Sequence, residues 1–352
     1  MHNRLDAVLS GTEIARFRLD LLAWFAAHKR DLPWRNTRDP YAIWISEIML
    51  QQTRVAAVIP YYERFLARFP GFRTLADAPE PEVLACWAGL GYYYRARNLQ
   101  IAARLMRELG RFPSTYEEIR RLPGIGDYTA AAVGSIGFDL PYAVVDGNVF
   151  RVLSRIFADS TNIAGSRGHK HFAALAGKLL DRSQPGAFNQ AVMELGATVC
   201  LPKNPQCLLC PISTLCRALR SGRQNDLPVK IVRQKSVREE RELFWIERDG
   251  KLLVWQRPAA SRLMPGFWEL PERDQLPQIA AGRKLGSFRH TITFHIYRFE
   301  LIEAAPPPDI GRCRWVTLED PMAIPASTVL KKAVRIVAKR RGERQALEAC
   351  AS

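Results

Sequence analysis

The sequence predicts a multidomain protein that joins an all-α domain at residues 1–220 to an α+β domain at residues 239–345. The 352 residues exceed the length of a typical single domain. Apolar residues recur at helical spacing through the first part, whereas the last part alternates apolar and polar residues around an Asp-Gly turn. Residues 221–238 are polar and basic without periodicity, which indicates a linker.

Helices are expected throughout the first part. Residues 16–29 (RFRLDLLAWFAAHK) and one helix from residue 41 to about residue 59 both show a helical apolar pattern. Two further helices, STYEEIRRL and DYTAAAVGSIGF, flank a PGIG hairpin at residues 123–126. Glycines at this hairpin permit a tight turn and leave amide groups at a helix N-terminus, where they can hold a phosphate.

In the last part, residues 242–257 predict two strands around Asp249-Gly250. Residues 287–302 read as one alternating strand, and residues 327–341 as a basic amphipathic helix. No internal repeat or low-complexity tract is present.

The formal net charge is +16, which favours a polyanionic partner such as nucleic acid. A generally arginine-rich proteome is the alternative, and an anionic membrane is disfavoured because no long basic helix flanked by aromatic residues stands out. The N-terminal residues carry charges too early for a signal peptide, and no apolar run approaches the length of a membrane span. We therefore expect a cytoplasmic protein, nucleoid-associated in a bacterial cell, with no membrane partner.

Four of the seven cysteines lie within one short stretch and are expected to bind a metal, because disulfides are rare in the cytosol. They are Cys200, Cys207, Cys210 and Cys216, with gaps of six, two and five residues. Four thiolates can hold either zinc or an iron–sulfur cluster. The other cysteines are expected to be packing or surface residues.

Two carboxylates occur in unusual settings. Asp146 in AVVDGNVFR follows apolar residues and precedes a glycine, so it is either a helix cap or a functional anion. Glu47 has apolar neighbours on both sides, and burial there raises the pKa of a carboxyl toward the range of a general acid. The alternative for Glu47 is a solvated carboxylate near a helix end.

Several motifs in residues 20–220 together resemble the MutY-type adenine DNA glycosylases of the helix-hairpin-helix superfamily, to which endonuclease III also belongs. They are LPWR (32–35), WISEIMLQQT (44–53), GLGYYYRARNL (89–99), LPGIGDYTA (122–130), VDGNV (145–149) and MELGA (193–197). The resemblance implies a monomer that removes adenine mispaired with 8-oxoguanine, and with guanine as well, from double-stranded DNA in base excision repair. It also implies that the four cysteines hold a 4Fe-4S cluster.

The resemblance assigns catalytic roles to four residues. Glu47 would protonate adenine at N7, and the Asp146 carboxylate would face the anomeric carbon, while Tyr128 and Asn148 orient it. Strand-nicking relatives carry a lysine nucleophile where this sequence has Tyr128. Because a phenol cannot form a Schiff base, a monofunctional enzyme is expected.

The remaining assignments concern contacts with DNA. By resemblance, Trp34, Arg35 and Glu194 line the adenine pocket. Gln51 and Tyr92 enter the base stack beside 8-oxoguanine, with Gln52 next to them, although clustered tyrosines are more often core residues. The hairpin residues Leu122, Gly124 and Gly126 grip the DNA backbone.

The last part resembles the Nudix-like recognition domain of the same family, through MPGFWELPE at residues 264–272. The acidic helix with which Nudix hydrolases bind magnesium is missing after Gly266, so a binding module without hydrolase activity is expected. HTITFHIY at residues 290–297 stands where the family has a Phe-Ser-His loop. Thr293 and His295 are therefore the candidates for reading 8-oxoguanine.

Three alternatives stay open at this point. One is a bifunctional glycosylase that also nicks the strand. Another is a thymine or uracil mismatch glycosylase, which Glu47 disfavours because pyrimidine excision gains little from an acid at N7. The third is a lesion-binding protein without activity, which would need neither carboxylate.

Overall fold

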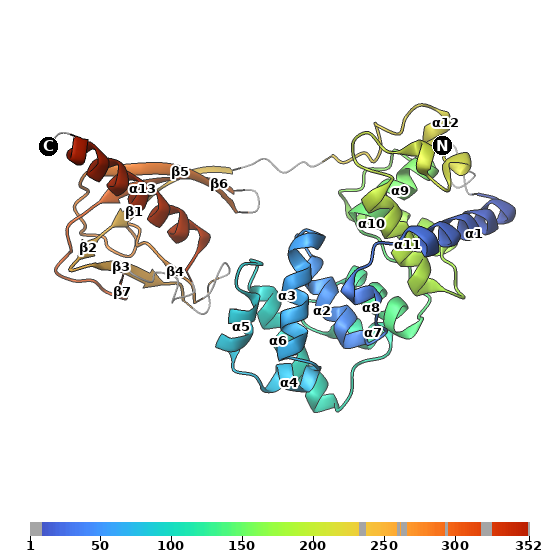
Figure 1. Cartoon of the computed structure of the whole chain (residues 1–352), viewed down its shortest axis with the longest axis horizontal. Coiled ribbons are helices and arrows are strands. Elements are labelled where there is room, and N and C mark those ends of the chain that lie inside the picture. The colour runs from blue at the N-terminus through green and yellow to red at the C-terminus, as the bar shows by residue number, and fades with distance from the viewer. Residues whose placement is uncertain are drawn as a thin grey trace. The chain divides into compact units, whose positions relative to one another are not determined.

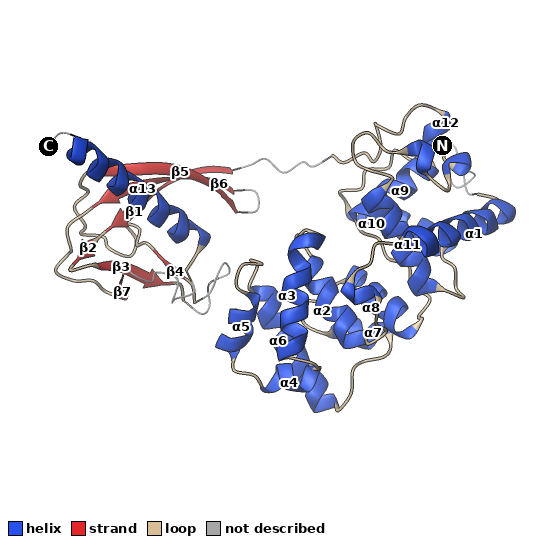
Figure 2. Cartoon of the chain, viewed as in Figure 1, coloured by secondary structure: helices blue, strands red, loops and turns tan. Residues whose placement is uncertain are grey.

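The computed structural model describes residues 9–231, 237–258, 261, 266–292, 295–317 and 326–350, with side chains up to residue 342. The chain divides into two compact units, residues 1–232 and 233–352. The described elements of the first unit are helices and those of the second are strands and one long helix (Figures 1 and 2). No described helix is both long enough and apolar enough to cross a membrane.

The first unit is built from twelve described α-helices and three short 3₁₀ helices. The α-helices are α1 (Gly11–His28), α2 (Pro40–Leu50), α3 (Val55–Arg68), α4 (Phe72–Asp77), α5 (Glu80–Trp87), α6 (Tyr94–Leu109), α7 (Tyr116–Arg121), α8 (Asp127–Phe138), α9 (Gly147–Ile156), α10 (Ser166–Leu179), α11 (Pro185–Thr198) and α12 (Arg217–Arg220). The 3₁₀ helices are η1 (Pro33–Arg35), η2 (Cys207–Leu209) and η3 (Ser213–Leu215).

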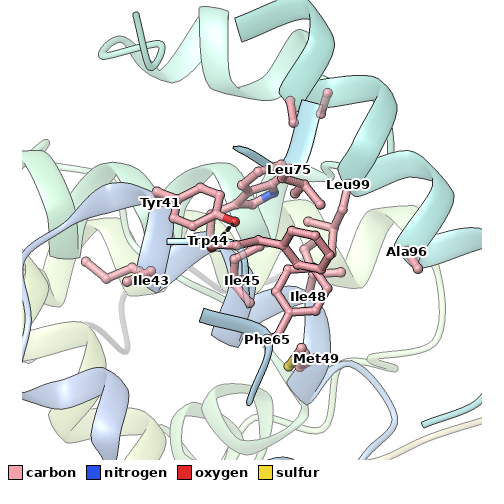
Figure 3. Close-up of a cluster of buried hydrophobic side chains, with 14 of the residues drawn as sticks. Tyr41, Ile43, Trp44, Ile45, Ile48, Met49, Phe65, Leu75, Ala96 and Leu99 are labelled. Carbon is pink, nitrogen blue, oxygen red and sulfur yellow. Dashed lines mark hydrogen bonds between the residues drawn. The ribbon is translucent and has the colours of Figure 1, made fainter. Parts of the chain in front are cut away.

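Helix α2 lies at the centre of one hydrophobic core, because its residues from Tyr41 to Met49 are all buried. Figure 3 shows Trp44, Ile45 and Ile48 packed among side chains from several other helices. The hydroxyl of Tyr41 donates to the carbonyl of Phe69 at 2.9 Å. Apart from Ser46 and Glu47 these buried residues are apolar or aromatic, and a helix that is apolar on nearly all sides is expected to be buried.

The prediction of one helix from residue 41 to about residue 59 was wrong. The chain breaks at residues 51–54, the 51–54 loop, and resumes as α3. Gln52 has a φ of 58°, in the left-handed region that interrupts a right-handed helix. Polar residues in QQTR do not mark a helix end on their own, so the sequence pattern could not reveal the break.

The predicted helix-hairpin-helix is confirmed as α7, residues 122–126 and α8. Gly124 has a φ of 78°, and a Cβ there would lie 2.9 Å from the side chain of Asn98 on α6. Gly126 is the N-cap of α8, and no side chain caps this helix. The backbone N–H groups in the first turn of α8 therefore have no capping side chain as acceptor, and such groups can bind an anion.

The second unit contains two small sheets and α13 (Thr328–Cys350). One sheet has the order β1-β6-β5, with β1 (Val237–Trp245) parallel to β6 (His295–Glu303) and β5 (Lys284–Ile292) antiparallel to it. The other has the order β2-β3-β4, with β7 also paired to β3. These strands are β2 (Glu247–Arg248), β3 (Lys251–Gln256), β4 (Trp268–Glu269) and β7 (Cys313–Thr317). Residues of α13 such as Leu330 and Ala333 pack into the core beneath these strands.

Two predictions for this unit have different outcomes. The Asp249-Gly250 turn is confirmed, since both residues have positive φ and join β2 to β3. The single strand over residues 287–302 was wrong, because β5 and β6 pair with each other as antiparallel neighbours. Alternation continues through both strands without a Gly, Pro, Asn or Asp between them, so the pattern carried no turn signal.

Candidate active site

A cavity of about 340 Å³ lies in the first unit and collects most of the residues predicted for the site. Its volume falls in the range typical of small-ligand pockets. The predicted residues that line it are Trp34, Arg35, Glu47, Gln51, Tyr128, Asp146, Asn148 and Glu194. Arg30, Gln190 and Met193, which were not predicted as site residues, line it too. Helices α2, α8, α9 and α11 thus bring residues distant in sequence to one cavity.

Glu47 is buried, with 6% of its surface exposed, and its Oε2 atom has no hydrogen-bond partner among the described residues. Burial raises its pKa to about 7, the Asp146 charge adds to that rise, and a hydrogen bond with Tyr128 opposes it. The solvated alternative for Glu47 was therefore wrong. A buried carboxyl with a free oxygen and this pKa can hold a proton for transfer near neutral pH.

Asp146 caps helix α9 and also faces the cavity. Its Oδ1 accepts from the backbone N–H of Val149 at 2.7 Å, and its Oδ2 accepts from Asn148 Nδ2 at 3.0 Å. Burial raises the pKa of Asp146, and these hydrogen bonds together with the charge of Arg151 act against that rise. The two interpretations of Asp146, helix cap and cavity anion, are compatible, because one oxygen caps the helix while the carboxylate lines the cavity.

Asn148 is held by Arg151, a residue that the sequence analysis did not single out. Arg151 Nη2 donates to Asn148 Oδ1 at 2.7 Å, and its Nε donates to the carbonyl of Cys200 at 2.7 Å. Because Arg151 binds the oxygen of the Asn148 amide, the NH₂ group of that amide points to Asp146. Both residues lie on α9, three apart, where side chains share a helix face.

Glu194 on α11 accepts from two arginines at the cavity wall. Its Oε1 accepts from Arg30 Nε at 2.8 Å, and its Oε2 accepts from Arg30 Nη2 and Arg35 Nη2, both at 2.7 Å. Burial opposes ionisation of Glu194, but the arginine hydrogen bonds outweigh it and lower its pKa to about 2. Glu194 therefore stays ionised, and its oxygens are already engaged by protein donors.

Replacing Glu194 with glutamine is expected to lower the free energy of unfolding by about 3 kcal/mol, because it leaves the buried Arg35 guanidinium without its counter-charge. Urea unfolding followed by circular dichroism of the helices measures the change. The control is Asp20→Asn, which breaks the exposed Arg16–Asp20 pair and should cost less than about 1 kcal/mol. Equal stabilities of the two variants would contradict the conclusion that Glu194 stabilises the fold as the counter-charge of Arg35.

Trp34 and Tyr128 form the aromatic part of the cavity. Trp34 is 8% exposed and meets Tyr62 edge to face at 5.4 Å between ring centroids. The hydroxyl oxygen of Tyr128 lies 3.3 Å from the sulfur of Met193. Burial and the neighbouring carboxylates raise the pKa of Tyr128 well above its ordinary value, so the phenol stays neutral. A neutral phenol can donate a hydrogen bond but cannot act as an amine nucleophile.

Gln51 lines the cavity, and Tyr92, which is not among the lining residues, lies on a separate loop. Gln51 Nε2 donates to Thr129 Oγ1 at 3.4 Å, and Gln52, next to it, is exposed. Tyr92 is 50% exposed and has a φ of 50°, so it is not a core residue. Gln52 and Tyr92 thus both have left-handed backbone, which is strained for non-glycine residues and occurs often at functional sites. Of the hairpin residues, Leu122 is buried while Gly124 and Gly126 are exposed.

The four clustered cysteines line one small cavity in the loop between α11 and α12. Arg155 Nη1 donates to Cys200 Sγ at 3.2 Å, and Arg155 is buried without a carboxylate partner among the described residues. In that part of the chain no three His, Cys, Asp or Glu side chains are arranged to hold one metal ion. The groups that could bind a metal cluster at this cavity are the four cysteine thiols, and the buried Arg155 guanidinium lies beside them.

The predicted lesion-reading residues belong to the second unit. Thr293 lies outside the described residues, as do Met264 and Pro265 of the MPGFWELPE motif. His295 begins β6, where its Nδ1 lies 2.6 Å from Glu239 Oε1 and its ring stacks on Tyr297. The His295 side chain is thus held by β1 and β6.

Comparisons with known proteins identify relatives of this chain. A family model described as "HhH-GPD superfamily base excision DNA repair protein" matches residues 45–176. The adenine DNA glycosylase of Mus musculus is 36% identical over 403 residues, covering 92% of this chain and 78% of the mouse protein.

Two solved structures share the helical fold. A thermostable thymine-DNA glycosylase matches with a TM-score of 0.55 and 32% identity, over 60% of this chain and 98% of that one. An endonuclease III in a DNA complex matches with a TM-score of 0.52 and 23% identity, over 61% and 99%, which shows the fold alone. With the extended similarity to the mouse protein, these findings show that the chain is a DNA N-glycosylase and belongs to the adenine DNA glycosylase family of the HhH-GPD superfamily.

Proposed function

We propose that the protein removes adenine mispaired with 8-oxoguanine, and with guanine as well, from double-stranded DNA, without cutting the strand. The observation that carries this proposal is the pair of carboxylates in one cavity with different surroundings. Glu47 has a free oxygen and a raised pKa, whereas Asp146 accepts two hydrogen bonds. Two carboxyls in separate environments can act as acid and anion at the same pH.

In this mechanism the adenine is flipped into the cavity beside Trp34. Glu47 donates its proton to N7, which makes the base a neutral leaving group as the C–N bond breaks. The sugar then develops oxocarbenium character, and the Asp146 carboxylate stabilises that positive charge. Asn148 and Arg151 keep Asp146 in place through their hydrogen bonds, so the anion needs no reorganisation during the reaction. Water then adds its oxygen to the anomeric carbon, and the proton that it loses passes through solvent to restore the Glu47 acid.

Tyr128 supports the monofunctional part of the proposal. No lysine lines the cavity in the described part of the chain. By the resemblance of the hairpin motif, Tyr128 stands where strand-nicking relatives carry the lysine nucleophile. A neutral phenol cannot form the Schiff base on which strand cleavage depends.

The test of this function is a duplex series with adenine opposite 8-oxoguanine, guanine or cytosine. We expect free adenine from the first two duplexes and an abasic strand that stays intact until alkali is added. Strand cleavage before alkali, together with an adduct trapped by borohydride, would establish the bifunctional alternative. Adenine released equally fast opposite cytosine would refute the partner specificity.

In this proposal the predicted domain at residues 239–345, which lies within the second unit, is a Nudix-like module that reads 8-oxoguanine. His295 contributes an imidazole held by Glu239 on the sheet surface. Thr293 is the second candidate, and its hydroxyl can donate or accept a hydrogen bond. The protein acts as a monomer in the bacterial cytoplasm.

The four cysteines hold a 4Fe-4S cluster in this proposal. Each thiolate of such a cluster binds a different iron, so the thiols need not converge on one point as they must around zinc. The Arg155 guanidinium beside Cys200 offsets part of the negative charge of the thiolates. When bound, the cluster supplies a covalent link across the loop and a redox-active centre.

The cluster is tested by Cys207→Ser, which we expect to lose bound iron, acid-labile sulfide and visible absorbance. The matched control is Cys86→Ser, which lies outside the cavity and should keep about four irons per chain. Elemental analysis of the wild-type protein decides the metal, since stoichiometric zinc without sulfide would contradict the assignment.

A further inference from the structure

Arg95 is a buried charge at the start of α6 that the proposed chemistry does not use. Only 3% of its surface is exposed, and no ion pair with a carboxylate is found for it in the described part of the chain. Burying an unpaired guanidinium is expensive, so its hydrogen bonds must compensate for lost hydration.

The Arg95 guanidinium binds backbone carbonyls from two separate segments. Nη1 lies 2.7, 3.2 and 2.6 Å from the carbonyl oxygens of Ile48, Met49 and Gln51, and Nη2 lies 3.3 Å from those of Leu90 and Gly91. The first three carbonyls lie at the C-terminal end of α2, where a helix has no internal donors for its carbonyls and carries partial negative charge. The last two belong to residues 88–93, the 88–93 loop. Arg95 therefore ties the end of α2 to this loop.

Both segments contain strained backbone directly beside the guanidinium. Gln52 in the 51–54 loop has a φ of 58°, and Tyr92 in the 88–93 loop has a φ of 50°. Arg95 also lies 5.4 Å from the Tyr92 ring centroid and 5.3 Å from that of Trp87. Strained residues of this kind persist only where surrounding contacts over-determine them. One cation contacts the backbone of Gln51 and the ring of Tyr92 at once.

We propose that Arg95 is a positioning residue that holds Gln51 and Tyr92 as a preformed pair, so that both enter the base stack together while adenine is extruded. The proposal rests on the proposed function, which places these two side chains at the DNA. A planar guanidinium suits this task because its donors reach both segments in a fixed geometry, which a lysine ammonium cannot reproduce. The role concerns opening of the duplex and not the bond-breaking step.

The test follows duplex opening without bond cleavage. The duplex contains 2′-fluoro-2′-deoxyadenosine, which resists excision, opposite 8-oxoguanine, with 2-aminopurine as the neighbouring base. Wild-type protein is expected to raise 2-aminopurine fluorescence as the stack opens. Arg95→Met, which keeps the apolar stem, should lose most of this rise, and Arg95→Lys should give an intermediate amplitude. Arg107→Met is the matched control on the same helix, in an exposed pair with Asp77, and should behave as wild type.

Rates on cleavable DNA separate positioning from chemistry. At saturating protein, Arg95→Met is expected to lower single-turnover release from the paired duplex on the order of 10²-fold, the effect of a small misplacement. Release from a duplex with adenine opposite an abasic-site analogue, which is already unpaired, should fall far less. The pH dependence of the rate should stay as in the wild type, because Glu47 is unchanged.

Two results would overturn the proposal. One is a folded Arg95→Met or Arg95→Lys protein with full fluorescence change and full rate on the paired duplex. The other is an equal loss on paired and unpaired adenine, which would mean that Arg95 serves α2 and Glu47 alone. The fluorescence assay requires no base release, so failure of the proposed function would appear separately, as wild-type protein that opens the duplex but frees no adenine.

Discussion

Asp146→Asn is expected to release adenine at least about 10³-fold more slowly than the wild-type protein in single-turnover experiments. The substitution removes the charge that faces the developing oxocarbenium ion but keeps a side-chain oxygen that can accept from Val149 N–H. Asparagine is as good a helix N-cap as aspartate, but its NH₂ would face the Asn148 NH₂ where Asp146 Oδ2 now accepts, so the free energy of unfolding should fall by about 1 kcal/mol.

This comparison separates the two roles of Asp146. Asp146→Ala removes the cap as well, and should cost about 1 kcal/mol of stability beyond the loss in Asp146→Asn. If Asp146→Asn kept an undiminished rate, the carboxylate would be only a helix cap and the catalytic assignment would be wrong.

Glu47→Gln is expected to lower the rate of adenine release by about 10²–10⁴-fold, because glutamine cannot donate the proton to N7. Wild-type activity should decline as the pH rises through about 7, where Glu47 loses its proton. The residual activity of Glu47→Gln should lack that decline. If the rate of Glu47→Gln declined at high pH in the same way as the wild-type rate, another group would be the acid.

The same substitution has a predictable effect on stability. The pKa of Glu47 rises from an ordinary 4.5 to about 7 in the folded protein. The folded state therefore holds a proton that the unfolded chain has lost between these values, and stability falls as the pH rises through this window. Glu47→Gln should melt at a higher temperature than the wild type above pH 7 and at a similar temperature below pH 4.5.

Several residues that line the cavity could be predicted from sequence because they lie in short motifs. Glu47 lies in an apolar run, and Asp146 follows the hairpin at a fixed distance. The resemblance placed Tyr92 at the DNA, but the Tyr-Tyr-Tyr run by itself is equally consistent with packing, so the residue pattern alone could not predict that Tyr92 is exposed. Its positive φ, which sets it apart, is a property of the folded loop.

The arginines that organise the site were missed for a common reason. Arg30, Arg95 and Arg151 act through hydrogen bonds to groups from other segments of the chain, mostly backbone carbonyls in the case of Arg95. Every residue has a carbonyl, so no residue type marks the partner in advance. In a chain with 51 lysines and arginines, only the fold shows which of them are buried.

The second unit shows a different limit. The Asp249-Gly250 turn was predictable because both positions require the left-handed backbone that Gly and Asp tolerate. The hairpin between β5 and β6 has no such residues, so its alternation read as one long strand.

The most direct test of the account identifies the base that is released. Four duplexes carry adenine, thymine, guanine or cytosine opposite 8-oxoguanine, and mass spectrometry of the small molecules freed by wild-type protein reads the outcome. The account predicts free adenine from the first duplex alone, as expected for an acid at N7 provided by Glu47. Release of thymine in place of adenine, the activity named for the similar thymine-DNA glycosylase structure, would contradict it.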